Sequence, residues 1–131
     1  MNQSTKTGSC LCGSVTYQVQ GELRPVVVCH CTMCRKQSGH YVAATSAPSE
    51  NLTIQGDSLR WYKSSDYAER GFCANCGGNL FFRPFSKAYT SIFAGTLDGD
   101  TGLKIEGQLF PEDKGDYYEL LDVPVVVQND L

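Results

Sequence analysis

The chain has 131 residues, a formal net charge of -3, 41% hydrophobic residues and 11% aromatic residues. This composition is typical of a globular protein, and the length suffices for one domain with its own hydrophobic core. The acidic balance argues against nucleic acid and anionic membranes as partners. No apolar stretch is long enough to span a bilayer, and the polar segment before Cys10 lacks the apolar core of a signal peptide. We therefore expect a single cytoplasmic domain, 1–131.

The hydrophobic pattern predicts a mainly β chain. Val15, Tyr17 and Val19 alternate with polar neighbours, which is the period of a half-buried strand. Further strands are predicted at 25–28, 41–45, 52–55, 59–62, 79–83, 89–93 and 105–110, because these apolar segments are separated by turn residues. One short helix is predicted at about 32–37, with Thr32 as its N-cap and Gly39 just after its end.

Seven cysteines form two pairs and one triplet: Cys10 and Cys12, Cys73 and Cys76, and Cys29, Cys31 and Cys34. An odd count would leave one cysteine unpaired in a full set of disulfides, and cytosolic thiols stay reduced. Both considerations favour metal binding. Four thiolates complete a tetrahedral zinc site, whereas three thiolates leave one position open for water or substrate.

The two pairs are predicted to share a structural zinc ion. Gly13 follows the first pair and Gly77 follows the second, and glycine allows a backbone that turns amide N–H groups toward thiolate sulfur. Joining the pairs closes a loop of roughly 60 residues, where a cross-link removes much chain entropy. Buried free cysteines and a redox dithiol are the alternatives.

The triplet is the predicted catalytic metal site. On extended backbone, Cys29 and Cys31 share one face and His30 lies on the other, where it serves as a hydrogen-bonded neighbour. Cys34 follows on the first turn of the helix, whose N-terminus favours thiolates. We therefore expect thiols of low pKa at this site.

Three further residues are candidate helpers at the triplet. Arg35 and Lys36 add positive charge and are predicted to bind the ligand, and His40 is a predicted catalytic residue. His40 is also a candidate fourth ligand, which would close the site as Cys3His. The sequence leaves both roles of His40 open.

Several segments together resemble the glutathione-dependent formaldehyde-activating enzyme family. They are residues 8–15, 29–39, 69–77 and 80–82, and the later segments 95–98 and 109–114 fit the C-terminal part of the family. The resemblance covers about residues 8–124, and the order of the three cysteine clusters is its most specific feature.

The resemblance implies an Mss4-like β fold of antiparallel sheets with two zinc ions per chain. The two cysteine pairs would hold a structural ion and the triplet would hold a catalytic ion. The implied activity is carbon–sulfur lyase chemistry, the reversible joining of glutathione and formaldehyde to S-hydroxymethylglutathione. Two positions depart from the family pattern, since Gln108 stands near a family histidine and Tyr117 near a family tryptophan. These departures point to another thiol or another carbonyl compound.

The proposed chemistry follows from the open metal position. A thiol bound there would lose its proton and then meet a small aldehyde. Two alternatives lie outside enzyme chemistry: a zinc-stabilised interaction module, and a redox-sensitive zinc protein that loses metal when the triplet is oxidised.

Overall fold

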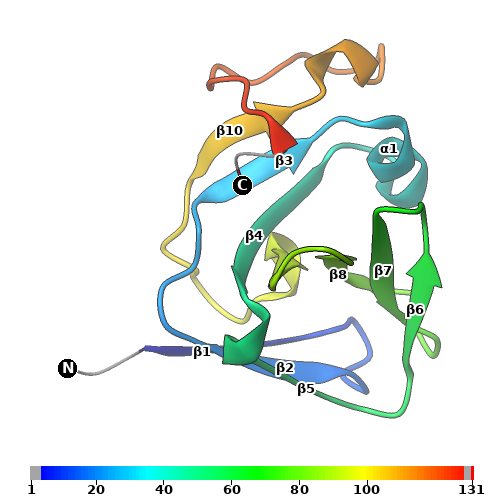
Figure 1. The fold of residues 1–131 in the computed structure, drawn as a ribbon, viewed down its shortest axis with the longest axis vertical. Coiled ribbons are helices and arrows are strands. Elements are labelled where there is room, and N and C mark those ends of the chain that lie inside the picture. Colours follow the sequence, from blue (N-terminus) through cyan, green and yellow to red (C-terminus); the bar gives the residue numbers. More distant parts are fainter. Residues whose placement is uncertain (1–3, 129–130) are drawn as a thin grey trace. The chain divides into compact units, whose positions relative to one another are not determined.

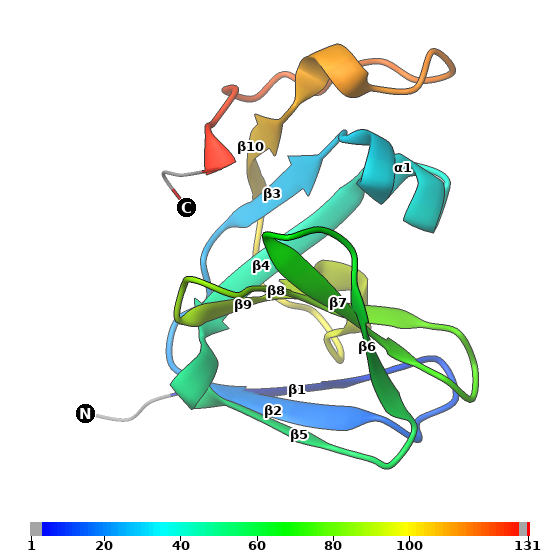
Figure 2. The same ribbon diagram turned by 45° about the vertical axis from the view of Figure 1, so that its right-hand side comes forward.

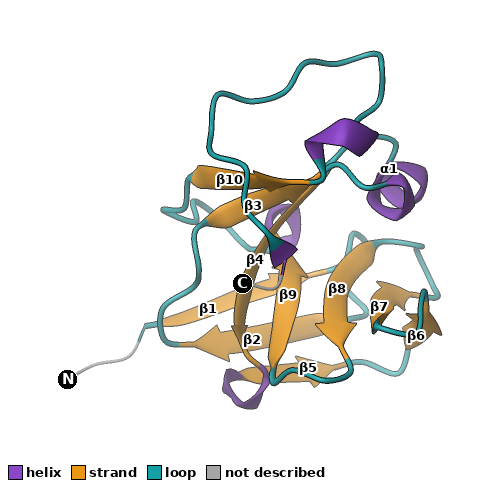
Figure 3. Ribbon diagram, turned by 45° about the horizontal axis from the view of Figure 1, so that its top comes forward, coloured by secondary structure: helices purple, strands orange, loops and turns teal. Residues whose placement is uncertain are grey.

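The computed structural model describes residues 4–128 and 131, and the chain divides into two compact units. The first unit comprises Met1–Arg24 and Thr45–Thr101, and the second comprises Pro25–Ala44 and Gly102–Leu131. Strands dominate the chain, as the orange arrows in Figure 3 show. The mainly β fold predicted from the sequence is therefore confirmed. The expectation of one domain stays a prediction.

The first unit contains a three-stranded antiparallel sheet in the order β1-β2-β5 (Figure 2). Its strands are β1 (Thr5–Ser9), β2 (Thr16–Gln20) and β5 (Leu52–Gln55). Tyr17 and Val19 are buried while their polar neighbours on β2 are exposed, which confirms the predicted alternation.

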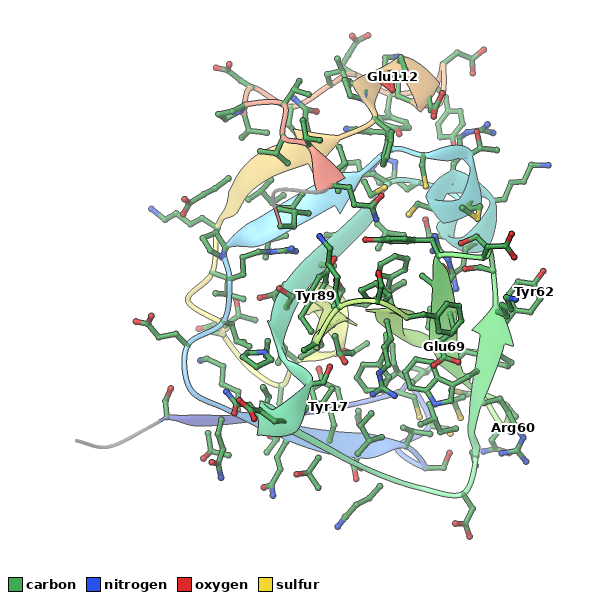
Figure 4. All side chains as sticks on the ribbon, in the orientation of Figure 1. Tyr17, Arg60, Tyr62, Glu69, Tyr89 and Glu112 are labelled. Atoms are coloured by element: carbon green, nitrogen blue, oxygen red, sulfur yellow. The ribbon has the colours of Figure 1, made fainter. Side chains whose placement is uncertain are left out.

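Four further strands of the first unit pair antiparallel in the order β9-β8-β7-β6. They are β6 (Leu59–Lys63), β7 (Ala68–Cys73), β8 (Asn79–Pro84) and β9 (Tyr89–Phe93). Leu80, Phe81 and Ile92 are fully buried and form their core. Arg60 and Tyr62, labelled in Figure 4, share the exposed face of β6. The 3-10 helices η1 (Ser49–Asn51) and η2 (Ala94–Thr96) also belong to this unit.

The second unit places a short helix directly after a strand (Figure 1). It contains β3 (Val26–Cys29), α1 (Thr32–Ser38), β10 (Ile105–Leu109), the 3-10 helix η3 (Pro111–Asp113) and residues 42–44 of β4 (Val42–Pro48). β3 pairs antiparallel with β4 and parallel with β10. No helix in residues 4–128 or 131 is long and apolar enough to cross a membrane.

The N-cap of α1 lies one residue earlier in the chain than the sequence predicts. Cys31, and not Thr32, is the N-cap, because its backbone is extended and its sulfur accepts a hydrogen bond from the backbone N–H of Cys34. Gly39 ends the helix in the left-handed conformation, at φ 82°, as the sequence predicts.

Candidate metal centres

The four-cysteine cluster lies in the first unit. Cys10 and Cys12 belong to the turn between β1 and β2, Cys73 ends β7, and Cys76 lies in the turn before β8. The Sγ atom of Cys12 is 3.7 Å from that of Cys10 and 3.8 Å from that of Cys73. All four sulfur atoms lie within 4.8 Å of one another. Zinc–sulfur bonds of about 2.3 Å in a tetrahedron put the sulfurs about 3.8 Å apart, so the cluster fits a zinc ion.

Backbone N–H groups point at the sulfurs of this cluster. The N–H of Val15 donates to Cys10 Sγ at 3.3 Å, and the N–H groups of Asn75 and Cys76 donate to Cys73 Sγ at 3.3 and 3.4 Å. Such donors stabilise negative charge on sulfur. The cluster is therefore built to hold thiolates.

Two polar side chains support the same cluster, and the sequence analysis missed both. The Ser14 hydroxyl lies 3.1 Å from Cys12 Sγ and 3.2 Å from Cys73 Sγ, and the Asn75 side-chain amide donates to Cys12 Sγ at 3.2 Å. The hydrogen bond from Ser14, and then that from Asn75, lowers the pKa of Cys12 to about 5. Ser14 also lowers the pKa of Cys73. The available signal was position along the chain, because Ser14 lies two residues after Cys12 and Asn75 lies between Cys73 and Cys76.

The turn glycines of this cluster adopt the conformation that the sequence predicts. Gly13 has φ 81° and Gly77 has φ 77°, and an added Cβ at either position would meet no atom within 4 Å. Glycine is therefore favoured at these two positions because of the left-handed backbone and not because of a lack of space. The Gly77 N–H donates to the carbonyl of Cys73 at 2.7 Å and closes the turn.

The three-cysteine cluster lies in the second unit. Cys29 ends β3, Cys31 caps α1 and Cys34 is buried on the first turn of α1. Their sulfur atoms lie within 4.8 Å of one another, and no fourth cysteine, histidine or carboxylate among the described residues joins the group. The donor set is three thiols, which suits zinc and leaves room for one exogenous ligand.

The thiols of the triplet are not all of low pKa. Hydrogen bonding with Cys31 and Cys34, followed by burial, raises the pKa of Cys29 well above its usual value. The sequence expectation of a low pKa is therefore wrong for Cys29, because three crowded sulfurs oppose one another's ionisation. A bound cation would reverse this, since it favours the thiolate form.

The two histidines have different surroundings. His30 is fully buried, and both ring nitrogens form hydrogen bonds, Nδ1 with the Tyr118 hydroxyl and Nε2 with Gln108 Oε1, each at 2.9 Å. His40 is exposed, and its ring lies against Tyr41 and edge-on to Tyr118, at centroid distances of 4.1 and 4.5 Å. Neither histidine belongs to the three-sulfur group.

The two cations after the triplet also differ. The Nε atom of Arg35 is buried and has no hydrogen-bond partner, whereas Lys36 is exposed. A buried guanidinium N–H without a partner is costly and attracts an anionic group. The two side chains therefore differ in their surroundings: Arg35 has a buried N–H without a partner, and Lys36 lies in solvent.

Comparison with known proteins agrees with this arrangement. The family model of the glutathione-dependent formaldehyde-activating enzyme matches residues 5–113, and the chain belongs to this family. An uncharacterized lyase of Schizosaccharomyces pombe is 30% identical over 118 residues, covering 86% of this chain and 82% of the relative. A Halomonas elongata protein, provisionally named a glutathione-dependent formaldehyde-activating enzyme, is 30% identical over 124 residues, covering 86% of this chain and 79% of the relative.

A solved structure shares the fold. The crystal structure of a Rhodobacter sphaeroides protein, a structural-genomics target, aligns with a TM-score of 0.63 over 92% of this chain and 99% of its own. At 23% sequence identity, this likeness bears on the fold alone.

Proposed function

We propose that the two clusters hold two zinc ions with different roles. The structural ion would bind Cys10, Cys12, Cys73 and Cys76, and the catalytic ion would bind Cys29, Cys31 and Cys34. A zinc ion held by Cys29, Cys31 and Cys34 would have a fourth position free for an exogenous thiol, and it would lower the pKa of that thiol toward neutral pH. The thiol donor sets and the short sulfur–sulfur distances support this assignment.

The proposed activity is a carbon–sulfur lyase reaction on the adduct of a thiol and a small aldehyde. In the direction of synthesis, glutathione sulfur bonds to the carbonyl carbon of formaldehyde, the carbonyl oxygen takes up the thiol proton, and S-hydroxymethylglutathione forms. In the lyase direction the same carbon–sulfur bond breaks. The observation that carries this proposal is the three-sulfur group without a fourth protein ligand, in a chain of this family.

The residues around the triplet have roles in this reaction that follow from their surroundings. Arg35 would pair with a carboxylate of the thiol, because its buried Nε has no other partner. Exposed Lys36 would add attraction for anionic substrates. His40 would exchange the proton with solvent, since its ring is exposed beside Tyr41 and Tyr118. The proposed location is the cytosol, where all these thiols stay reduced.

Metal analysis and exchange spectroscopy test this function together. We expect two zinc ions per chain, and one in a variant with Cys29, Cys31 and Cys34 all changed to Ser. In exchange NMR with glutathione and isotope-labelled formaldehyde, the wild type should speed the interconversion of thiol and adduct, and the triple variant should not. A wild type with two zinc ions and no acceleration over free solution would contradict the enzyme and favour an interaction module or a redox role.

Arg35→Ala tests the substrate class within the same assay. Loss of one charge-assisted contact should raise KM for glutathione roughly tenfold or more. The uncharged thiol 2-mercaptoethanol serves as the control substrate, and its KM should not change. An equal effect on both thiols would contradict carboxylate recognition by Arg35.

A further inference from the structure

His30 separates two proposed metal ligands, yet the chemistry above does not use it. Its side chain is fully buried, and both ring nitrogens are hydrogen-bonded at 2.9 Å. A buried neutral imidazole with two fixed hydrogen-bond partners is held in one tautomer. A partner that can act only as an acceptor or only as a donor decides which ring nitrogen carries the hydrogen.

Sheet pairing brings Gln108 to this ring. β10 runs parallel to β3 with Gln108 opposite Val28. The side chains of residues paired across two strands point to the same face of the sheet, and so do side chains two residues apart on one strand. Gln108, Val28 and His30 therefore share one face. Cys29 points to the opposite face. The cysteine side of the strand and the Gln108 side are therefore separate, and His30 belongs to the latter.

The orientation of the Gln108 amide is set by its own backbone partners. Its Nε2 group donates to the carbonyls of Leu121 at 2.8 Å and Val123 at 2.9 Å. Both amide hydrogens are then used, and Oε1 is left as an acceptor facing His30 Nε2. A flipped amide would place its oxygen against two carbonyls. Of the two neutral tautomers of His30, only the one with hydrogen on Nε2 fits this acceptor, and Nδ1 of that tautomer accepts from the Tyr118 hydroxyl.

Tyr118 is itself held against the residues that follow α1. Its ring packs edge-on against His40 and Tyr41, at centroid distances of 4.5 and 5.9 Å, and Lys114 Nζ donates to its carbonyl at 2.9 Å. The neighbouring Tyr117 hydroxyl donates to a backbone carbonyl at the end of the helix, that of Gly39, at 2.9 Å. The hydroxyl bond to His30 thus fixes one end of a short aromatic segment that packs against the residues that follow α1.

We propose that Gln108 is a positioning residue that selects the Nε2–H tautomer of His30 and, through it, holds Tyr118 in place against His40 and Tyr41. The order of action runs from the fixed backbone carbonyls to Gln108, then to His30 and then to Tyr118. The kinetic consequence rests on the proposed function, because the segment that Tyr118 anchors would shape the thiol site. The tautomer itself does not depend on that function.

Nitrogen NMR of histidine-labelled, zinc-loaded protein tests the proposal directly. The chain contains only two histidines, so the buried and exposed rings can be assigned from a His40→Gln variant. We expect hydrogen on Nε2 of His30 and an unprotonated, hydrogen-bonded Nδ1. Gln108→Met should give a mixture of tautomers, whereas Tyr118→Phe should keep Nε2–H. Hydrogen on Nδ1 in the wild type, or a tautomer that changes in Tyr118→Phe but not in Gln108→Met, would overturn the proposal.

Gln108→Asn provides a milder variant if Gln108→Met does not fold. It keeps an amide but draws it back from His30 by one methylene, and it should also give a mixture. The matched controls are Gln18→Met, at an exposed glutamine on β2, and Tyr62→Phe, at an exposed tyrosine on β6. Neither control should alter the His30 signals.

The kinetic readout separates positioning from general stability. Tyr118→Phe should raise KM for the thiol roughly tenfold, keep kcat within about twofold, and leave the zinc content unchanged. An equal KM in Tyr118→Phe and wild type would contradict a link to the thiol site. If the wild type shows the expected tautomer but no thiol–aldehyde exchange, the proposed function fails and the assignment of Gln108 stands.

Discussion

The two cysteine clusters use the same ligand type in opposite surroundings. In the four-cysteine cluster, the Ser14 hydroxyl lowers the pKa of both Cys12 and Cys73. In the three-cysteine cluster, hydrogen bonding among the thiols raises the pKa of Cys29. Two thiols of the four-cysteine cluster are thus prepared for negative charge, although the pKa of Cys76 in the same cluster is raised, whereas Cys29 of the triplet is held in its neutral form. The difference suits one ion that stays bound and another that exchanges its ligand.

The largest expected effect concerns how much each cluster contributes to the stability of the folded chain. Cys73→Ser removes a fully buried ligand of the four-cysteine cluster, and we expect cooperative thermal unfolding to be lost. Structural zinc contributes about 10–16 kcal/mol in zinc-finger peptides, and whole domains are stable by only about 5–15 kcal/mol. Circular dichroism during heating, with zinc analysis, measures this.

Cys34→Ser is the matched control, since it makes the same chemical change at a buried cysteine of the other cluster. This variant should keep its circular dichroism spectrum and a cooperative transition while it loses one zinc ion. If both variants unfold alike, the division into a structural and an exchangeable site is wrong.

A smaller effect should follow from the removal of one hydroxyl group. Ser14→Ala deletes the main cause of the lowered pKa of Cys12, and we expect roughly 10- to 100-fold weaker zinc binding at the four-cysteine cluster. A thiol whose pKa falls from 9.0 to about 5 on folding stabilises the folded state fully above 9.0 and loses this contribution as the pH falls through about 5. The variant should therefore release zinc at a higher pH than wild type.

A chromophoric chelator, followed along a descending pH series, measures that release. Ser86→Ala, at an exposed position of the same unit, should behave as wild type. Release at an unchanged pH from Ser14→Ala would show that the hydroxyl does not support the thiolates.

The smallest expected effect comes from a matched pair of glycines. Gly77 and Gly39 have φ 77° and 82°, and an added Cβ meets nothing within 4 Å at either site. Alanine at each position should cost about 1–2 kcal/mol, because only the left-handed backbone opposes it. Gly77→Ala should loosen zinc at the four-cysteine cluster alone, and Gly39→Ala should alter thiol–aldehyde exchange alone. Denaturant unfolding, zinc analysis and exchange NMR of both variants measure this, and a crossed pattern of effects would contradict the separation.

Local patterns allowed most of the fold to be predicted. The strands at β5 and β9 fall where apolar and β-branched segments lie between turn residues, and Gly39 marks the end of α1. Two strands were missed for physical reasons. β1 is a polar strand with only Gly8 buried, and β7 is buried on both faces, so neither shows a clean alternation.

The candidate site could likewise be predicted only in part from the sequence. The grouping of the cysteines could be predicted because their spacing along the chain is short within each pair and within the triplet. The bond between Gln108 and His30 spans 78 residues and depends on a parallel strand pair, which local sequence does not reveal. The Ser14 contacts depend on a side-chain rotamer in a turn, which periodicity does not describe.

The chain separation between Cys12 and Cys73 has a consequence during translation. These residues lie 61 positions apart, and at 5–20 residues per second the ribosome needs roughly 3–12 seconds to bridge the gap. The triplet emerges within this interval, between the two halves of the four-thiol cluster. The nascent polypeptide thus presents Cys29, Cys31 and Cys34 to cellular metal and oxidants before the four-cysteine cluster can assemble.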